Sequence, residues 1–308
     1  MKASLLVIIS SIFFAPVAIS QPELSKSSVE KIKILSWNIY MLPGFLSPGK
    51  VPRAEAIGKL LASSDYDVIV FQEAFHQKAR NTISRLLTSA FPFHAGPANQ
   101  KTFSLKTNSG IWIFSKYHIS QVHSIIFKTC YGMDALSRKG ALLIEVMVND
   151  NPVQIVGTHL QNAGDDWRKQ RQCAELYDRL LKKYERIGIP QIVCGDFNIE
   201  RHGISNNYQS MLQTLNVDDG ELSSEKKYSY DGTTNDLQST SGTQQNLIDY
   251  ILIRSNQAFV KSSDRRIQVY QQRWHNEHQD LSDHYSVATE IYYQSRPAVY
   301  TVSIPGNR

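Results

Sequence analysis

Residues 191–198 read QIVCGDFN, a short apolar run that ends in a glycine and is followed at once by polar residues. The run Gln191–Gly195 has the length and composition of a buried strand bounded by turn-forming residues. Asp196 and Asn198 then lie at the end of that strand. Because strand ends in a layered sheet meet along one edge, where ligands bind, this stretch predicts both a sheet and a site at its edge.

The same arrangement, an apolar strand with a polar residue at its end, recurs along the chain. These positions are Asn38 after Lys33–Trp37, Glu73 after Val68–Gln72, His159 at the end of Val153–Leu160, Asp249 within Leu247–Ile253, and Asp283 and His284 before Tyr285–Tyr292. Together with Asp196 and Asn198 they amount to four carboxylates, two asparagines and two histidines. Burying so many polar groups together is costly unless a cation and an anionic ligand share the site.

The remaining elements complete a layered domain. Helices are predicted at Pro52–Ser63, Phe75–Ala90 and Asp166–Ile187, and further strands at Ile111–Phe114 and Ala141–Val148. Asn149, Asp150 and Asn151 turn two of the strands into a hairpin. Ser223–Gln245 is polar and predicts a long surface loop. Hairpins mixed with helices favour an α+β or α/β domain, and no repeat or linker divides the chain.

The composition is that of an ordinary soluble chain, long enough at 308 residues to bury a full core. The net charge of +5 is too small to identify an anionic partner. The basic residues are also scattered, without the long basic run that favours a polyanion groove: Arg80, Arg85, Lys182, Lys183, Arg265 and Arg266. We therefore expect no nucleic-acid partner.

The first twenty residues have the pattern of a secretory signal peptide. Lys2 precedes an apolar run, Leu5–Val17, and small residues stand before Gln21. The run is short for a transmembrane helix, and no other segment approaches that length. We predict that residues 1–20 are removed and that the protein is secreted; a buried N-terminal strand is the alternative.

The chain has three cysteines, Cys130, Cys173 and Cys194. An odd number cannot form a complete disulfide framework, and their spacing is not that of a zinc site. Cys194 lies in an apolar run, which predicts a small core residue. A bridge between Cys130 and Cys173 stays open, although we expect none.

Each polar position also has a purely structural explanation when it is taken alone. Asn38 could be a turn residue, Glu73 could stand in the cap of the next helix, and Asp196 could form a turn with its own backbone. The histidines could be core or surface side chains. Asp249 is harder to explain in this way, because a carboxylate among apolar residues needs a partner. One shared site explains the whole ordered set.

That ordered set resembles the endonuclease/exonuclease/phosphatase superfamily. The motifs that carry the resemblance are Trp37-Asn38, Gln72-Glu73, Thr158-His159-Leu160, Gly195-Asp196-Phe197-Asn198, Asp249-Tyr250 and Ser282-Asp283-His284. The resemblance covers about residues 31–293 and implies a four-layer α/β/β/α sandwich of two mixed sheets, similar to deoxyribonuclease I. It divides the chain into a signal peptide (1–20), a lead-in (21–30), a catalytic domain (31–293) and a C-terminal tail (294–308).

Within the superfamily, further stretches resemble the bacterial sphingomyelinases. They are residues 37–43 (WNIYMLP), 110–116 (GIWIFSK), 134–140 (DALSRKG) and 158–161 (THLQ) with Arg168 and Gln172 in the following helix. The resemblance implies a secreted, metal-dependent phosphodiesterase that hydrolyses sphingomyelin to ceramide and phosphocholine at a membrane surface. It implies Mg²⁺ as the cofactor, with Mn²⁺ or Co²⁺ as alternatives, and we expect a monomer.

The resemblance also assigns roles to the site residues. Glu73 and Asn38 are metal ligands, because Mg²⁺ prefers hard oxygen donors. His284 is the general base, oriented by Asp249 or Asp283. Asp196 and Asn198 position the water and bind phosphate oxygens, and His159 donates a hydrogen bond to the phosphate or the leaving oxygen. Lys139, held by Asp134, adds a positive charge at the phosphate.

Two departures from the sphingomyelinase pattern stand out. Thr107, Asn108 and Ser109 occupy positions that are often acidic in those enzymes and hold an accessory metal, so we expect that second site to be missing or altered. Ile267–Leu281 replaces a hairpin with an aromatic tip, and its one tryptophan, Trp274, could be either a membrane anchor or a packed side chain.

Other functions use the same residues. A secreted nuclease or a phosphoinositide-type phosphatase shares the catalytic set, and a catalytically silent lipid-binding module would keep only the cleft. Such a module is disfavoured because Glu73, His159, Asp196 and His284 are all present.

Overall fold

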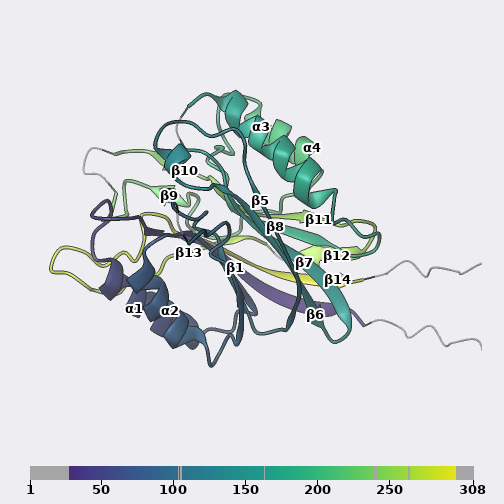
Figure 1. Ribbon diagram of the computed structural model, residues 1–308, viewed down its shortest axis with the longest axis horizontal. Helices are drawn as coiled ribbons and strands as arrows, with labels where there is room; N and C mark the ends of the chain where they lie inside the picture. Colours follow the sequence, from purple (N-terminus) through teal and green to yellow (C-terminus); the bar gives the residue numbers. More distant parts are fainter. Residues whose placement is uncertain are drawn as a thin grey trace, which may run out of the picture.

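The computed structural model describes residues 28–102, 104, 106–162, 164–238, 242–262 and 264–295. The predicted signal peptide and residues 296–308 of the predicted tail lie outside these residues. The first strand, β1, begins at Glu30 and the last, β14, ends at Gln294. These two strands pair antiparallel, with Glu30 opposite Tyr293, so both ends of the described chain leave the same end of the fold (Figure 1).

Within the described residues, the larger sheet has seven strands and is mixed. Its order is β12 (Phe259–Ser262), β14 (Ser286–Gln294), β1 (Glu30–Met41), β2 (Val68–Ala74), β4 (Trp112–Ser115) and β3 (Phe93–Ala95), with β13 (Arg266–Gln268) also paired to β14. Strands β1 and β2 are parallel and the other pairs are antiparallel.

In the part of the chain that the structure describes, the second sheet has five strands, and it is also mixed. Its order is β11 (Asp249–Arg254), β8 (Gln191–Asp196), β7 (Asn151–His159), β6 (Gly140–Val148) and β5 (Ile119–Ile126). Strands β7 and β8 run parallel, and the pairs β11–β8, β6–β7 and β5–β6 are antiparallel. The predicted hairpin joins β6 to β7, and Asn149 and Asp150 both have positive φ, as a tight two-residue turn requires. Asn151, predicted in that turn, is instead the first residue of β7.

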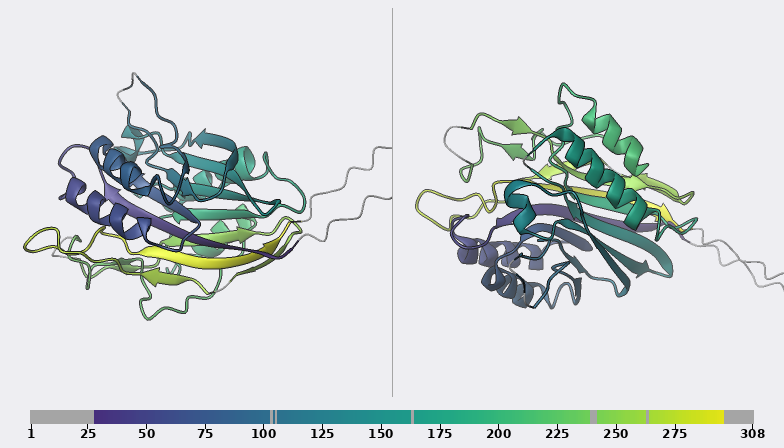
Figure 2. Two further views of the ribbon diagram at one scale, coloured as in Figure 1. Left: turned by 90° about the horizontal axis from the view of Figure 1, so that it is seen from below. Right: turned by 45° about the horizontal axis from the view of Figure 1, so that its top comes forward.

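The two sheets stack face to face, with helices on the outer faces (Figures 1 and 2). Helices α1 (Lys50–Ala62) and α2 (Gln77–Leu87) cover the larger sheet, and α3 (Asp166–Leu176) and α4 (Asn207–Leu215) cover the smaller one. The predicted four-layer sandwich of two mixed sheets is confirmed.

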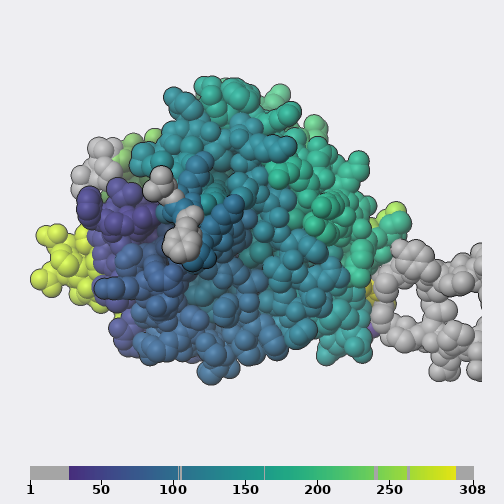
Figure 3. Space-filling model, in the orientation of Figure 1, coloured from purple at the N-terminus to yellow at the C-terminus, as the bar shows by residue number. Residues whose placement is uncertain are grey.

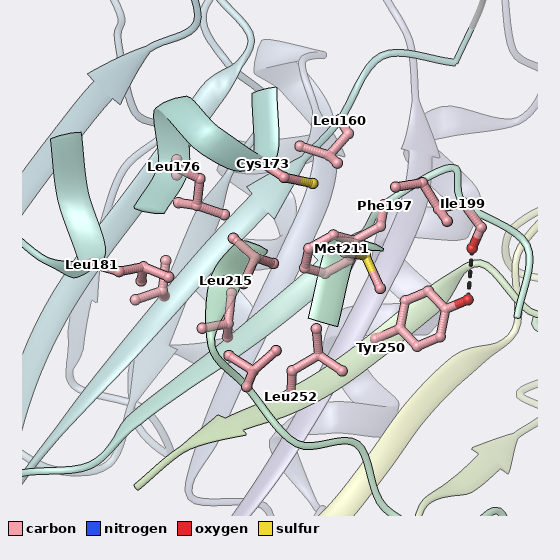
Figure 4. Packing of buried hydrophobic residues seen from close by; sticks show 14 of the residues in the cluster. Leu160, Cys173, Leu176, Leu181, Phe197, Ile199, Met211, Leu215, Tyr250 and Leu252 are labelled. Carbon is pink, nitrogen blue, oxygen red and sulfur yellow. Dashed lines mark hydrogen bonds between the residues drawn. The ribbon is translucent and has the colours of Figure 1, made fainter. Parts of the chain in front are cut away.

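Three apolar clusters of described residues hold the layers together. The middle one joins the inner faces of the sheets through side chains such as Val70, Ile113 and Ile155. Gly157 on β7 lies so close to the other sheet that a Cβ there would come within 2.8 Å of Val70 and 2.7 Å of Ile111. The outer cluster under α3 and α4 is shown in Figure 4. Burial of this apolar surface is the main force that fixes the sheets and helices relative to each other.

The structure corrects one predicted helix and adds elements that the sequence pattern missed. The helix predicted at Asp166–Ile187 is too long: α3 ends at Leu176, and a single wider turn (Tyr177–Leu181) continues it. Leu180 and Leu181 stay fully buried through that turn. The missed elements are β3, β5, β12, β13, α4 and a short 3₁₀ helix, Gly132–Leu136. Within the predicted surface loop, β9 (Tyr230–Asp231) pairs with β10 (Gln245–Asn246).

The structure answers two questions that the sequence left open, one about the cysteines and one about Trp274. Cys130, Cys173 and Cys194 are all thiols without a disulfide, as expected. Trp274 is a packed side chain: its indole Nε1 donates a hydrogen bond of 2.8 Å to the carbonyl of Asp280, and its ring lies against Gly49. The loop that carries Trp274 projects beside the segment that leads into α1 (Figure 3). No helix in the described residues reaches the length and apolar character that crossing a bilayer demands.

Candidate active site

The register of the strands brings the predicted residues to the end of the fold opposite the chain termini. His159 is the last residue of β7 and pairs with Asp196, the last residue of β8. Asp249, the first residue of the antiparallel strand β11, pairs with Asp196 from the other side. In the larger sheet, Asn38 on β1 lies beside the end of β2, where Glu73 stands. Strand β1 runs past Asn38 to Met41, further than the sequence predicts.

One cavity of about 790 Å³ opens at this edge. Eight of the ten predicted site residues line it: Glu73, Asp134, Lys139, His159, Asp196, Asn198, Asp283 and His284. The other two, Asn38 and Asp249, are buried behind the lining and contact residues in it. All ten residues therefore belong to one constellation.

His284 and Asp249 form a buried hydrogen-bonded pair. The distance from Nδ1 of His284 to Oδ2 of Asp249 is 2.8 Å, and both side chains are almost wholly inaccessible to solvent. Burial alone would lower the pKa of His284, but the negative charges of Asp249 and Asp196 outweigh burial and raise that pKa well above its ordinary value. Of the two carboxylates predicted to orient this imidazole, Asp249 is the one in contact with it. Asp283 instead accepts from the hydroxyl of Ser282 at 3.4 Å.

His159 lies in a second cluster with Lys139 and Asn198. Its Nε2 is 3.1 Å from Nζ of Lys139, 3.3 Å from Nδ2 of Asn198 and 3.4 Å from Oδ2 of Asp196. Burial, followed by the charge of Lys139, lowers the pKa of His159 well below its ordinary value, so the imidazole is neutral near pH 7. Because an ammonium group can only donate, Nε2 of His159 accepts from Lys139. The donation from His159 to a phosphate that the resemblance implies would need the other tautomer or the other nitrogen.

Lys139 is held in place by three contacts. Its Nζ lies 3.0 Å from Oδ1 of Asp134 and donates to the carbonyl of Leu160 at 2.7 Å, in addition to the contact with His159. Its side chain is only 3% exposed. The ammonium group is therefore fixed at the cavity by partners in the 3₁₀ helix Gly132–Leu136 and at the end of β7.

Glu73, Asp283 and Asp196 form an acidic group in the same cavity. Burial, and then the negative charge of Asp283, raises the pKa of Glu73 to about 8. Burial and Asp249 raise the pKa of Asp196 to about 6, and burial raises that of Asp283. Oε2 of Glu73 is buried and has no hydrogen-bond partner. Desolvated carboxylates of this kind are what a bound cation would stabilise.

The side chain of Asn38 completes this group. Its Nδ2 donates to Oδ2 of Asp196 at 3.1 Å, and its Oδ1 accepts from the backbone N–H of Tyr40. Glu73 has a positive φ of 56°, and Gly110 allows the close approach, since a Cβ at Gly110 would lie 3.1 Å from the backbone of Glu73. Oxygen donors on the ends of β1 and β2 thus fit a hard divalent cation.

Two groups of three among the described residues bring metal-type ligand atoms within 4.8 Å of one another: Asp196, Asp249 and His284 in the cavity, and His275, Glu277 and His278 on a surface loop. The first group does not include the predicted ligands Glu73 and Asn38. Its 2.8 Å contact between His284 and Asp249 is a hydrogen bond that uses Nδ1 of the histidine. Nδ1 of His284 and Oδ2 of Asp249 are therefore engaged with each other.

The structure adds two residues that the sequence did not single out. Arg53 is fully buried and donates to the carbonyls of Ile39, Tyr40 and Leu281, which ties the end of β1 to the segment before Asp283. Tyr230 lines the cavity, with its ring edge-on to that of His284 at 5.1 Å between centroids. The sequence could have indicated Arg53, because it stands on the buried face of a predicted helix. No sequence pattern indicated Tyr230, because it lies in the long polar loop.

The site crosses the boundary between the two sheets. Asn38, Glu73 and His284 belong to the larger sheet or its connections, whereas His159, Asp196 and Asp249 belong to the smaller one. The hydrogen bonds from His284 to Asp249 and from Asn38 to Asp196 therefore join the sheets.

Comparison with known proteins places the chain among phosphoesterases. Residues 35–284 match the family described as the endonuclease/exonuclease/phosphatase family. Among curated proteins, the chain is 26% identical over 298 residues to a phospholipase C of Staphylococcus aureus, with 85% of this chain and 88% of that protein covered. It is 27% identical over 267 residues to a sphingomyelinase C of Bacillus cereus, with 78% and 80% covered.

The fold is also similar to solved structures. A crystal structure of beta toxin from Staphylococcus aureus, a double mutant with bound magnesium ions, superposes with a TM-score of 0.77 at 22% identity. The superposition covers 87% of this chain and 100% of that one. At this identity the likeness establishes the shared fold.

Proposed function

This chain belongs to the endonuclease/exonuclease/phosphatase family, and from that premise we propose that it is a Mg²⁺-dependent enzyme that hydrolyses sphingomyelin to ceramide and phosphocholine. Its family and its relatives make it a phosphodiester hydrolase. The observation that carries the finer proposal is that His284, hydrogen-bonded to Asp249 behind it, lines one cavity together with the acidic group around Glu73. The names of the curated relatives support sphingomyelin as the substrate.

In the proposed reaction, His284 acts as the general base. Asp249 accepts a hydrogen bond from Nδ1–H, which leaves Nε2 as the nitrogen that takes a proton from water. The carboxylate of Asp249 then stabilises the imidazolium that forms, as it does in other histidine–carboxylate pairs. Asp196, 3.8 Å from Nε2 of His284, is close enough to hold that water.

The phosphate would bind beside Lys139, in the cluster that adjoins His284 through Asp196. Lys139 supplies a positive charge that is already desolvated and fixed, and the side-chain amide of Asn198 lies beside it, with Nδ2 3.3 Å from Nε2 of His159. A preorganised positive charge stabilises the negative charge that develops on phosphoryl oxygens without reorganisation during the reaction. Asp134 and His159 act as positioning residues for Lys139.

Glu73 and Asn38 would hold the cation, with Asp283 nearby as a further acidic group. A bound Mg²⁺ would polarise the phosphoryl group and neutralise part of its charge. The unpartnered Oε2 of Glu73 and the raised pKa values of the surrounding carboxyl groups support this assignment.

Replacing Asp249 with asparagine should lower kcat/KM by about 10²–10⁴-fold, the range expected for general base catalysis and its support. It should also move the acidic limb of the pH profile to lower pH. The charge of Asp249 helps to raise the pKa of His284, so its removal lets the imidazole lose its proton at lower pH. Measuring kcat/KM from pH 5 to 9 tests both effects. An unshifted acidic limb would remove Asp249 from this role.

The substrate is tested by phosphocholine release from sphingomyelin vesicles with Mg²⁺ and with EDTA. We expect release that depends on the cation, and little release from the same vesicles after chelation. Parallel assays with phosphatidylcholine, a phosphoinositide and DNA distinguish the rival functions. Cleavage of one of these instead of sphingomyelin would keep the phosphodiesterase and reject the substrate. Binding without any hydrolysis would favour the silent lipid-binding module.

The sequence features at the ends of the chain belong to the same proposal. Residues 1–20 would direct secretion, residues 31–293 would form the catalytic domain, and the enzyme would act as a monomer at a membrane surface. An N-terminal sequence of the exported protein that begins at Gln21 would support this assignment.

A further inference from the structure

Large apolar side chains are exposed around the mouth of the catalytic cavity. Leu46, Met133 and Leu136 line the cavity and are also exposed at its rim. Phe45 and Ile204 adjoin lining residues: Phe45 precedes Leu46, and Ile204 lies between Gly203 and Ser205, which both line the cavity. We call Phe45, Leu46, Met133, Leu136 and Ile204 the mouth rim.

The exposure of the mouth rim is unusually high for apolar residues. Phe45 is 97% exposed, Met133 is 70% exposed and Ile204 is as exposed as an isolated residue, at 108%. Single exposed apolar residues are common, but a set gathered from three separate loops around one opening marks a binding surface. The loops are the β1–α1 connection, the 3₁₀ helix Gly132–Leu136 and the β8–α4 connection.

Next to the mouth rim, the cationic side chain of Arg168 lies against two aromatic rings and pairs with Asp165, at 2.8 Å between Nη1 and Oδ2. The guanidinium of Arg168 is 4.7 Å from the ring centroid of Tyr131 and 4.6 Å from that of Trp167. Trp167 and Tyr131 are each 56% exposed, and Asp166, the neighbour of Trp167, lines the cavity. Tryptophan and tyrosine beside a basic side chain are the residues that favour the boundary between bilayer and water. This arrangement favours a lipid surface over an apolar protein groove.

The other aromatic candidate for a membrane anchor is engaged elsewhere. The indole of Trp274 donates to the carbonyl of Asp280, and its ring stacks on His278 at 5.2 Å and lies against Gly49. Its exposed neighbours, residues 271–273 and 275–277, are all polar. The loop at 271–280 therefore offers little apolar surface to a bilayer.

We propose that the mouth rim is the surface that docks this enzyme on a phospholipid bilayer. This inference rests on the proposed function, because it takes the substrate to be a membrane lipid. With the mouth rim inserted among the head groups, the cavity opens at the depth of the phosphodiester. The head group can then reach His284 and Lys139 while the acyl chains remain in the membrane.

The test uses the double variant Phe45→Ser/Ile204→Ser, since neither side chain lines the cavity. The matched control is Val122→Ser/Ile187→Ser, because these residues are 51% and 55% exposed but do not line the cavity. Both pairs are examined with sphingomyelin/phosphatidylcholine vesicles and with a short-chain sphingomyelin kept monomeric in solution. Vesicle binding is measured by flotation in the presence of EDTA, so that hydrolysis does not alter the vesicles.

We expect the mouth-rim variant to bind vesicles and to hydrolyse them about 10–100-fold less well, since each inserted apolar side chain contributes roughly a factor of ten in affinity. Hydrolysis of the monomeric lipid should stay within about twofold of the parent. The control variant should match the parent in every assay.

Three results would overturn the proposal. One is unchanged vesicle binding and hydrolysis by the mouth-rim variant. Another is an equal loss on the vesicle and the monomeric substrate, which would make these residues part of the substrate pocket or of folding. A third is a parent that is dimeric in gel filtration and becomes monomeric in the variant, which would make the surface an interface between copies. If the parent cleaves neither lipid but still floats with vesicles through the mouth rim, the substrate assignment fails and the docking surface stands.

Discussion

Replacing His284 with alanine is expected to lower kcat/KM for sphingomyelin by about 10²–10⁴-fold, the usual contribution of a positioned general base. The imidazole is the basic group in the cavity that is oriented by a carboxylate, through the 2.8 Å contact with Asp249. Its loss removes the proton acceptor without removing a proposed metal ligand. Phosphocholine release measured at saturating Mg²⁺ tests this prediction.

The control is His94→Gln, because His94 lies on β3 and does not line the cavity. Both variants should keep the circular dichroism of the parent. The contact from Nε1 of Trp37 goes to the backbone carbonyl of His284 and is kept in the alanine variant. A His284→Ala protein that folds and retains more than about a tenth of the parent kcat/KM would contradict the base assignment.

Replacing Glu73 with glutamine is expected to weaken Mg²⁺ binding by at least about 100-fold, because even partners outside the coordination sphere of a metal contribute 10–100-fold. The neutral amide keeps the shape of the side chain and removes its charge. Isothermal titration with Mg²⁺ measures the effect directly, and the Mg²⁺ dependence of phosphocholine release measures it through activity. Glu55→Gln, at an exposed position on α1, is the matched control.

The pH dependence of stability and of Mg²⁺ affinity distinguishes a metal-binding carboxylate from a carboxyl group that is only buried. The pKa of Glu73, raised to about 8 by burial and by Asp283, exceeds its ordinary value near 4.5. The folded protein without metal therefore binds more protons than the unfolded chain between these values, and this carboxyl group makes stability fall as pH rises through that range. Because the cation must displace that proton, Mg²⁺ affinity should rise with pH up to about 8.

In Glu73→Gln, the pH dependence of stability and the pH dependence of Mg²⁺ affinity should both become weaker. Thermal unfolding without Mg²⁺ should show a variant that is more stable than the parent near pH 8, and Mg²⁺ should raise the Tm of the parent more than that of the variant. Equal stabilisation of both proteins by Mg²⁺ would show that the cation binds elsewhere.

The strand ends of the site could be predicted because each is a local pattern. An apolar run followed by a carboxylate, an amide or a histidine can be recognised within eight residues, as in QIVCGDFN. The ordered set and its resemblance then supplied the architecture. Elements with weak local signals were missed: β5 is a half-exposed edge strand, and β12 and β13 have only a few residues each.

Partners across the fold were harder to predict, since they depend on register. The sequence left Asp249 and Asp283 as equal candidates for orienting His284, and only the pairing of β11 with β8 brings Asp249 to the imidazole. The same holds for Arg53, whose acceptors lie on β1 and on the segment before Asp283. The predicted helix at Asp166–Ile187 failed for a related reason: its amphipathic pattern continues through residues that the structure folds as a wider turn.

The position of the site across the boundary of the two sheets has a consequence for substitutions far from it. Each sheet carries half of the chemistry, so the distance between His284 and Asp249 reports how the sheets are aligned. That alignment is set by a tightly packed interface in which Gly157 touches Val70 and Ile111. A bulkier side chain at position 157 would push the two sheets apart at a point away from the cavity. The catalytic groups would then be misaligned before the protein unfolds. A substitution in the core can therefore abolish turnover while the fold stays intact. In a mutational scan of this enzyme, such a position would be mistaken for a catalytic one unless the packing between the sheets is considered.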